Sequence, residues 1–444
     1  MKRILRWSSI LILNFVIFFV AAEAISLGIY FSQESAFFYT NQLPTVVVEE
    51  KINTGVNNQE AASDNVQQLR HRLNLFWGYT ETPGSTHPVY KRLPDLASKG
   101  TVANQYGFHS QYNYPFTKND PNQFIIGVFG GSVSTRLTLQ VDKNLAEFLK
   151  EDPYFQNKEI VLLSFGNGGY KQPQQLQILS YFLSIGQEFD MVINIDGFNE
   201  IALSNINAQR NIDPSMPNAQ RIIPLLNLIN EEALSFEFLT ALAEVERHNQ
   251  QVLDLQIRKR NATFAFQWAI LNSLESRSMQ KFQMAQFEFD KLGSLESDQV
   301  LVNIQPFQND QGENELLQKI TENWANSSIL MLNMLEAQNI PYYHFLQPNQ
   351  YHATNRVFSE DELEIAINDD SPYKNSIEIG YPYLLEADER LLTANINYYD
   401  ASALFDSEEK IVYLDSCCHY NQRGNIILAR FIAESIIDNG DYRK

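Results

Sequence analysis

Cysteine is almost absent from this chain of 444 residues, which has only Cys417 and Cys418, next to each other. A disulfide framework needs several separated cysteines, and so does a cysteine-rich zinc site, so both are excluded. Two states stay open for the pair: a strained disulfide between neighbours, or two small thiols packed near a loop. We expect the second.

Positive charge is also scarce, because 33 basic residues stand against 53 acidic ones and leave a net charge of −20. An acidic surface repels phosphate backbones, and no basic stretch rich in aromatic residues offsets it, so nucleic acid is not an expected partner. Hydrophobic residues make up 44% of the chain and aromatic residues 12%, which is enough for a packed core. The length suits one large domain with insertions, or two ordinary domains.

One long apolar run lies within residues 1–31, behind three basic residues in the first six positions. The basic flank should stay in the cytoplasm, so the rest of the chain is expected outside it, in the periplasm or at the cell surface. Ala22-Glu23-Ala24 has the form of a signal-peptidase site, whereas the apolar residues at 25–31 make the run long enough to span a bilayer. We favour an uncleaved membrane anchor, with a secreted protein as the alternative if the segment is cleaved.

Residues 32–119 read as an extracytoplasmic linker followed by an irregular segment. The part at 32–68 is polar and rich in Asn, Gln and Glu, as in a loosely ordered stalk. The part at 73–114 holds many aromatic residues together with Gly and Pro. This composition favours irregular structure packed onto a domain.

The remaining segment, 120–444, begins with three short apolar runs at 124–129, 160–165 and 191–195. Their length and their Val and Ile content are typical of buried parallel strands, and the segments between them carry helical spacing. Alternation of strands and helices predicts an α/β fold with an open, doubly wound parallel sheet covered on both faces.

A helical insertion is expected at about 205–326. Residues 231–292 contain no Pro or Gly, which predicts one or two long helices that form a hairpin. We interpret the aromatic residues of this stretch as packing surface. The α/β pattern then resumes with a strand at 342–346 and ends in a helix at about 423–437.

Ligands of open parallel sheets bind beyond the carboxyl ends of the strands, so the residues that follow each apolar run are informative. After the first run, Gly130 and Gly131 permit a tight turn that leaves Ser132 at a helix N-terminus, where the helix dipole favours negative charge. After the second run, Gly169 can bring a backbone N–H close to a substrate oxygen. After the third run, Asn199 can offer its side-chain amide as a neutral donor.

Near the C-terminus, His419 follows Asp415 and comes just before the last expected helix. A histidine with a nearby carboxylate suits a general base that is held in one tautomer. The six other histidines lack such a setting in the sequence. No pair of them has the spacing of a zinc motif, so we expect no metal.

The order of these positions resembles that of the SGNH (GDSL-type) hydrolase family, whose sequence blocks centre on Ser, Gly, Asn and His. Ser132 matches the first block, Gly169 the second, Asn199 the third, and Asp415 with His419 the last. The resemblance covers roughly 120–200 and 325–440 and is closest to exported or membrane-anchored bacterial members.

Two features depart from the family pattern. Gly131 stands where the family usually has Asp, and three residues rather than two separate Asp415 from His419. The helical insertion is also larger than in compact members.

The resemblance implies a flavodoxin-like α/β/α fold in three layers and a catalytic mechanism without a cofactor. In that mechanism Ser132 is the nucleophile, His419 its base and Asp415 the residue that orients the imidazole. The oxyanion would be held by the N–H groups of Ser132 and Gly169 and by the side chain of Asn199.

Three functions stay open at this point. The first is an extracytoplasmic ester hydrolase that acts on acyl esters, such as O-acyl groups of envelope or exopolysaccharide sugars. The second is an O-acyltransferase that passes the acyl group to a sugar hydroxyl, since the same positions serve both reactions. The third is an inactive scaffold that binds a partner through the insertion. The intact Ser, Gly, Asn and His favour an enzyme.

Overall fold

The structure is a computed structural model that describes residues 2–34, 37–40, 71–85, 102–229, 236–292, 303–308 and 312–443. Most of the expected polar linker, 41–68, lies outside the described residues. The chain divides into two compact units. A helical unit contains α1 (Lys2–Glu34), α10 (Phe236–Arg260) and α11 (Ala265–Leu292). An α/β unit contains both sheets and, among the described residues, all other helices except the short η1.

A five-stranded sheet with all strands parallel is the centre of the α/β unit. Its order is β4-β3-β5-β6-β7, so that the chain starts inside the sheet, steps to one edge and then runs out to the other. Flavodoxin-like doubly wound sheets have this order. The predicted parallel sheet is confirmed, with strands β3 (Gln123–Gly130), β4 (Glu159–Ser164), β5 (Met191–Asp196), β6 (Tyr342–Leu346) and β7 (Asn397–Asp400).

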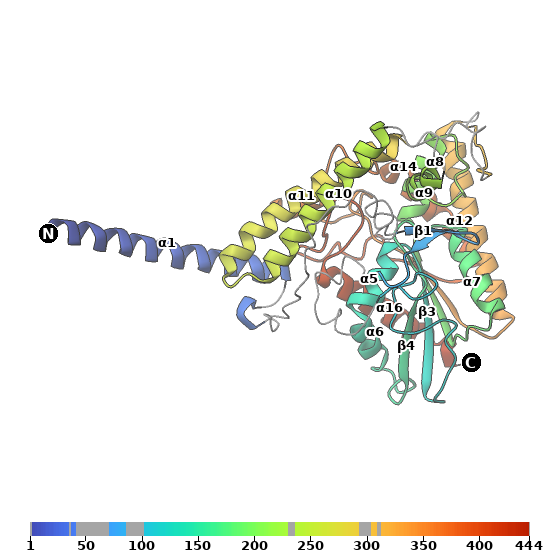
Figure 1. Ribbon diagram of the computed structural model, residues 1–444. Helices are drawn as coiled ribbons and strands as arrows, with labels where there is room; N and C mark the ends of the chain where they lie inside the picture. Colours follow the sequence, from blue (N-terminus) through green and yellow to red (C-terminus); the bar gives the residue numbers. More distant parts are fainter. Residues whose placement is uncertain are drawn as a thin grey trace. The chain divides into compact units, whose positions relative to one another are not determined.

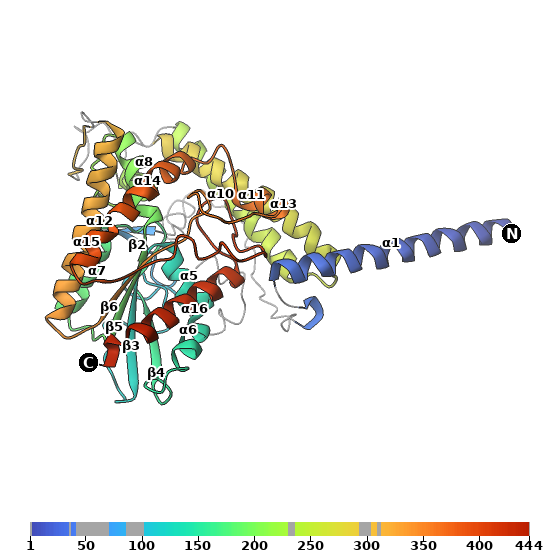
Figure 2. The same cartoon turned by 180° about the vertical axis from the view of Figure 1, so that it is seen from behind.

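Both faces of the sheet are buried, which explains why the strands read as continuous apolar runs. Within β3, Ile125 and Phe129 point into one hydrophobic core, whereas Ile126 and Val128 point into the other. Figures 1 and 2 show helices on opposite sides of the sheet. One side carries α7 (Gln174–Ser184) and α12 (Glu313–Glu336), and the other carries α5 (Ser132–Gln140), α6 (Asp142–Leu149) and α16 (Gln422–Asn439).

Shorter elements complete the α/β unit. Its other helices are α8 (Phe198–Gln209), α9 (Ala219–Ile229), α13 (Glu360–Ala366), α14 (Lys374–Glu386), α15 (Asp388–Thr393) and the 3-10 helix η4 (Asp441–Arg443). The segment expected as one insertion, 205–326, is therefore shared between the units, because α9 and α12 belong to the α/β unit and α10 and α11 to the helical unit.

A small antiparallel sheet stands where the sequence suggested irregular structure. Strands β1 (His71–Asn74) and β2 (Gly78–Glu81) pair across a short turn, and Gly78 adopts a φ of +92°. Trp77 and Tyr79 are fully buried there, which agrees with the expected packing onto the domain. Strands of four residues are too short to give a periodic signal, so composition alone suggested a loop.

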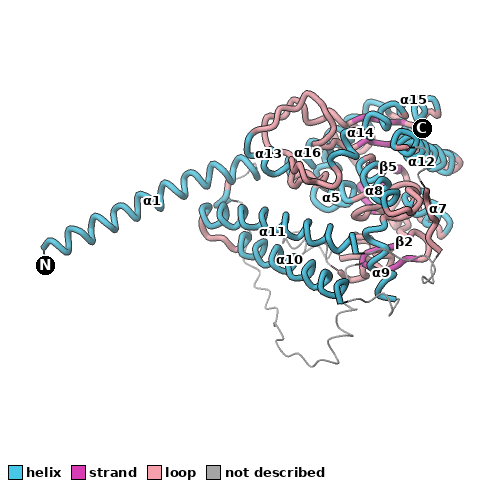
Figure 3. Tube along the Cα trace, turned by 90° about the horizontal axis from the view of Figure 1, so that it is seen from above, coloured by secondary structure: helices cyan, strands magenta, loops and turns pink. Residues whose placement is uncertain are grey.

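The helical unit is built around an antiparallel pair, α10 and α11, which run side by side in Figures 1 and 3. Buried Gln256 and Glu275 join the two helices through a hydrogen bond of 2.9 Å, and Lys259 pairs with the same carboxylate. A 3-10 helix, η1 (Phe38–Thr40), follows α1. Aromatic packing in this unit involves Tyr30, Phe38 and Trp268.

Candidate active site

The turn between β3 and α5 places Ser132 at the first position of the helix. Gly130 has a φ of +136°, and a Cβ atom there would lie 2.1 Å from the backbone oxygen of Ile195. A Cβ atom on Gly131 would lie 2.1 Å from Nδ2 of Asn199. Both positions therefore need glycine, because the turn passes directly against the next strand and against the side chain that follows it.

Ser132, His419 and Asp415 form one hydrogen-bonded row. Nε2 of His419 lies 2.7 Å from Oγ of Ser132, and Nδ1 lies 2.6 Å from Oδ2 of Asp415. Ser132 and His419, which form the first link of this row, are 287 residues apart in the chain. An imidazole held in this way can accept a proton from the hydroxyl while its other nitrogen donates to the carboxylate.

The extra residue between Asp415 and His419 is absorbed by a tight turn. Oδ1 of Asp415 accepts the backbone N–H groups of Cys417 at 3.0 Å, Cys418 at 3.2 Å and His419 at 3.3 Å. The chain thus curls around one carboxylate oxygen and leaves the other for the imidazole. The departure from the family spacing does not separate the two side chains.

Charge around the row perturbs both titratable groups. Burial raises the pKa of Asp415, but the positive charges of His419 and Arg136 and the backbone N–H of Cys417 outweigh it and hold the pKa well below its usual range. Burial and the charge of Arg136 lower the pKa of His419, whereas Asp415 and Cys418 raise it. The raising effects prevail and bring the pKa of His419 to about 9. The raised pKa favours the protonated imidazole in the free protein.

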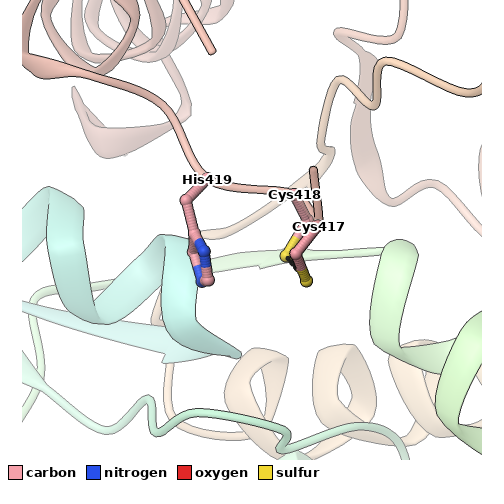
Figure 4. A group of neighbouring side chains, drawn as sticks. All are labelled: Cys417, Cys418 and His419. Carbon is pink, nitrogen blue, oxygen red and sulfur yellow. Dashed lines mark hydrogen bonds between the residues drawn. The ribbon is translucent and has the colours of Figure 1, made fainter. Parts of the chain in front are cut away.

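Two thiols accompany His419 on the same loop, as Figure 4 shows. Cys417 and Cys418 are free, with their sulfur atoms 3.1 Å apart. Burial raises the pKa of Cys418, but the hydrogen bond from Cys417 and the charge of His419 lower it to about 6, while the same hydrogen bond raises the pKa of Cys417. The expectation of two packed thiols agrees with this arrangement.

These three side chains could in principle offer ligands to a metal ion, since their donor atoms lie within 4.8 Å of one another. Both nitrogen atoms of His419, however, already form hydrogen bonds, to Ser132 and to Asp415. A metal ion at this position would have to break one of them. Metal binding and the hydrogen-bonded row therefore exclude each other.

Of the predicted oxyanion donors, Asn199 lies against the turn that carries Ser132, and Gly169 belongs to the loop that follows β4. Asn199 is in the first turn of α8, and its Nδ2 donates to the backbone oxygen of Tyr170 at 2.8 Å while lying against Gly131. Asn167 donates its backbone N–H to Gly130 at 3.4 Å, so the loop that holds Gly169 also meets the turn. Among the described residues, no hydrogen bond engages the N–H of Gly169.

A loop that the sequence reasoning missed supports the one with His419. It follows β6, and three of its side chains donate hydrogen bonds to backbone oxygens of the 415–417 segment. Gln350 donates to the oxygen of Asp415 at 3.0 Å, and Tyr351 donates to that of Ser416 at 2.7 Å. Asn349 donates to the oxygen of Cys417 at 3.1 Å. The signal was available, because this loop also follows an apolar run. Examination of the residues after 342–346 would have found it.

A second hydrogen-bonded Ser–His–Asp row shows that His344, one of the other histidines, does have a carboxylate partner. Nδ1 of His344 lies 2.8 Å from Oγ of Ser328, and Nε2 lies 2.7 Å from Oδ1 of Asp196. The sequence could not show this pairing, because 148 residues separate His344 from Asp196. All three side chains are buried, so this row is a polar link inside the core.

No protein-family model matches the chain, and no curated protein matches it. Among solved structures, it is similar to a Bacteroides fragilis protein provisionally described as an acylhydrolase, with 10% identity over 73% of this chain and 91% of that one. The TM-score is 0.34. The likeness is distant, so the chemistry of the site is inferred from the geometry of its own residues.

Proposed function

We propose that the protein is a serine ester hydrolase of the SGNH type. Ser132 is the nucleophile, His419 the general base and Asp415 the group that orients the imidazole. The observation that carries the proposal is the continuous hydrogen-bonded row of these three side chains, which begins just beyond the carboxyl end of β3. Active sites of open parallel sheets lie at this edge.

The reaction begins once His419 is neutral. Oγ of Ser132 attacks the ester carbonyl while its proton passes to Nε2 of His419, and a tetrahedral intermediate forms. The imidazolium then gives that proton to the departing alkoxide, and the acyl group stays on Ser132 as an ester. Water repeats the sequence on the acyl-enzyme, releases the carboxylic acid and restores the hydroxyl of Ser132.

Asp415 keeps Nδ1 of His419 protonated, so that Nε2 presents its lone pair to Ser132. The negative oxygen of the intermediate is stabilised by the backbone N–H groups of Ser132 and Gly169 and by the amide of Asn199. Each such donor contributes on the order of 3 kcal/mol to transition-state stabilisation.

The substrate is an acyl ester, with O-acyl groups on envelope or exopolysaccharide sugars as the proposed natural class. This assignment depends on an extracytoplasmic location. The N-terminal helix supports that location, because it is long and apolar enough to cross a membrane or to serve as a signal sequence. An O-acyltransferase would use the same first half-reaction and differ only in the acceptor of the acyl group.

The test uses the full chain in detergent with p-nitrophenyl acetate, with and without a sugar acceptor. We expect hydrolysis that disappears in Ser132→Ala. The matched control is Ser328→Ala, which removes the hydroxyl of the buried row and should leave turnover unchanged. Acetylated sugar as the main product would identify a transferase. Full turnover by folded Ser132→Ala would refute the proposed nucleophile, and Ser134 would be examined next.

A further inference from the structure

Helix α1 is longer than a bilayer requires and is mostly uncovered. It spans 33 residues, Lys2–Glu34, which is about 50 Å of helix, against a hydrocarbon core of about 30 Å. Its window Val16–Gln33 has a mean hydropathy of 1.6, and only 11% of it is buried. Large apolar side chains such as Ile17, Phe18 and Val20 face outward. Within the described part of the chain, other residues cover only a small part of this window.

One charged residue, Glu23, joins α1 to the hairpin of α10 and α11. Its carboxylate accepts the backbone N–H of Ala265 at 2.8 Å and that of Phe266 at 3.1 Å. These residues begin α11, whose first N–H groups have no partner within the helix. A carboxylate at this end also interacts favourably with the helix dipole. The tip of the hairpin is therefore fixed to α1 at Glu23.

Aromatic residues continue this contact on both sides of Glu23. One turn before it, the ring of Phe19 lies 5.2 Å from the rings of both Phe264 and Phe266, edge to face. After it, Tyr30 packs on Trp268 at 4.7 Å. Figures 1 and 3 show the turn of the hairpin meeting the end of α1. The contact is an extended interface, and it begins on the apolar side of Glu23.

We propose that the hairpin tip is a membrane-contact surface, with Phe264 and Phe266 immersed in the lipid–water interface beside a retained α1. The uncharged segment between Arg6 and Glu23, 7–22, has 16 residues and spans about 24 Å, most of a hydrocarbon core of about 30 Å. Glu23 then stands at the boundary, and the two rings lie on the lipid side of it.

Aromatic side chains rather than charge carry this contact. Phe264 and Phe266 are partly exposed and stack on each other with centroids 5.8 Å apart. Exposed phenylalanine rings are typical of the apolar surfaces that enter the lipid–water interface. The positive charge at the end of α10 is already neutralised in part, because Arg258 pairs with Asp254 and Lys259 pairs with Glu275 of α11. The partner is therefore a lipid surface without a required negative charge.

Retention of α1 follows from the same contacts. Cleavage after Ala24 would remove both Phe19 and Glu23, so the first N–H groups of α11 would lose their acceptor and the phenylalanine rings their partner. A segment that a peptidase discards has no reason to cap a helix of the mature protein. The N-terminal helix is therefore an anchor, independently of the proposed catalysis.

Depth-dependent quenching tests the surface. Full-length Phe264→Trp and wild-type protein are reconstituted in phosphatidylcholine vesicles, with plain or brominated acyl chains, and the difference between their emissions isolates the new tryptophan. The control is Phe236→Trp, at the opposite end of α10 and 84% exposed. We expect bromine to quench the tryptophan at 264 at least twofold and to leave that at 236 unchanged. Equal quenching at both positions, or none at 264, would overturn the proposal.

A second measurement needs no substitution. The intact mass of protein extracted from the membranes of an expressing bacterium should include residues 1–24. Loss of that segment from the mature protein would contradict an anchored helix, and with it the membrane position of the tip. Ester turnover in the same sample reports on the catalytic proposal separately.

Discussion

Asp415→Asn is the most informative single change in the proposed active site, because it separates two functions of one carboxylate. An asparagine can keep its Oδ1 in place and still accept the backbone N–H groups that Asp415 binds, of which Cys417 is the nearest at 3.0 Å. Its Nδ2 would replace the oxygen that lies 2.6 Å from Nδ1 of His419. An amide at this position donates, so Nδ1 must become the acceptor.

This tautomer change removes the base. With Nδ1 unprotonated, the proton of neutral His419 lies on Nε2 and points at Ser132, which then has nothing to accept its own proton. A change of this kind typically lowers kcat by about 10⁴-fold, or about 5 kcal/mol of transition-state stabilisation. The fold should lose much less, on the order of 1 kcal/mol, because the turn keeps its hydrogen-bond acceptor.

Asp415→Ala is the comparison variant. It removes the acceptor of three backbone N–H groups as well as the partner of His419, so the free energy of unfolding should fall by on the order of 3 kcal/mol or more. Turnover of p-nitrophenyl acetate measures the first effect, and urea unfolding followed by circular dichroism measures the second. Activity of Asp415→Asn within tenfold of the wild type would refute the role of Asp415 in setting the tautomer.

Four further outcomes follow from the contacts described above. The value of kcat/KM for an uncharged ester should rise with pH through about 9, because His419 must lose its proton before it can act as a base; a plateau already at pH 7 would contradict this. In Cys418→Ser the rise should move to lower pH, since Cys418 helps to raise the pKa of that imidazole. Asn199→Ala should lower kcat by about 10²- to 10³-fold with little change in KM. An effect on KM alone would show that Asn199 does not stabilise the oxyanion. Glu23→Ala should destabilise the helical unit by about 1 kcal/mol in thermal unfolding, and Glu23→Gln, which keeps an oxygen acceptor, should do so less.

The sequence predicted the strands that form apolar runs, including the edge strand β4, and missed the short strands β1, β2 and β7. β5 and β6 are buried at every position, so each appears as an uninterrupted apolar run. β7 has four residues, Asn397–Asp400, lies at the edge of the sheet and is polar at both ends. An edge strand of this length has no periodicity that distinguishes it from a loop.

Position along the fold, rather than residue type, was the useful signal for the site. Ser132 and Asn199 were proposed because they follow strands, and the structure places the side chain of Asn199 against the residue before Ser132. The partner of His344 could not be proposed in this way, because Asp196 meets it across neighbouring strands and not within one loop. Local sequence describes what surrounds a strand end but not which residues face each other across the sheet.

The two Ser–His–Asp rows of this protein show why residue identity alone does not make a catalytic site. In the buried row, Asp196 also accepts hydrogen bonds from the indole of Trp324 and the amide of Asn194, so its charge is fully engaged within the core. The serine of that row, Ser328, lies in the middle of α12 with no exposed surface, and no substrate can reach it. Ser132 lies instead at the first position of a helix and is partly exposed, and the N–H groups of a first helical turn have no partner within the helix. The row that ends at Ser132 can therefore accept a substrate, whereas the row that ends at Ser328 can only hold α12 to the sheet.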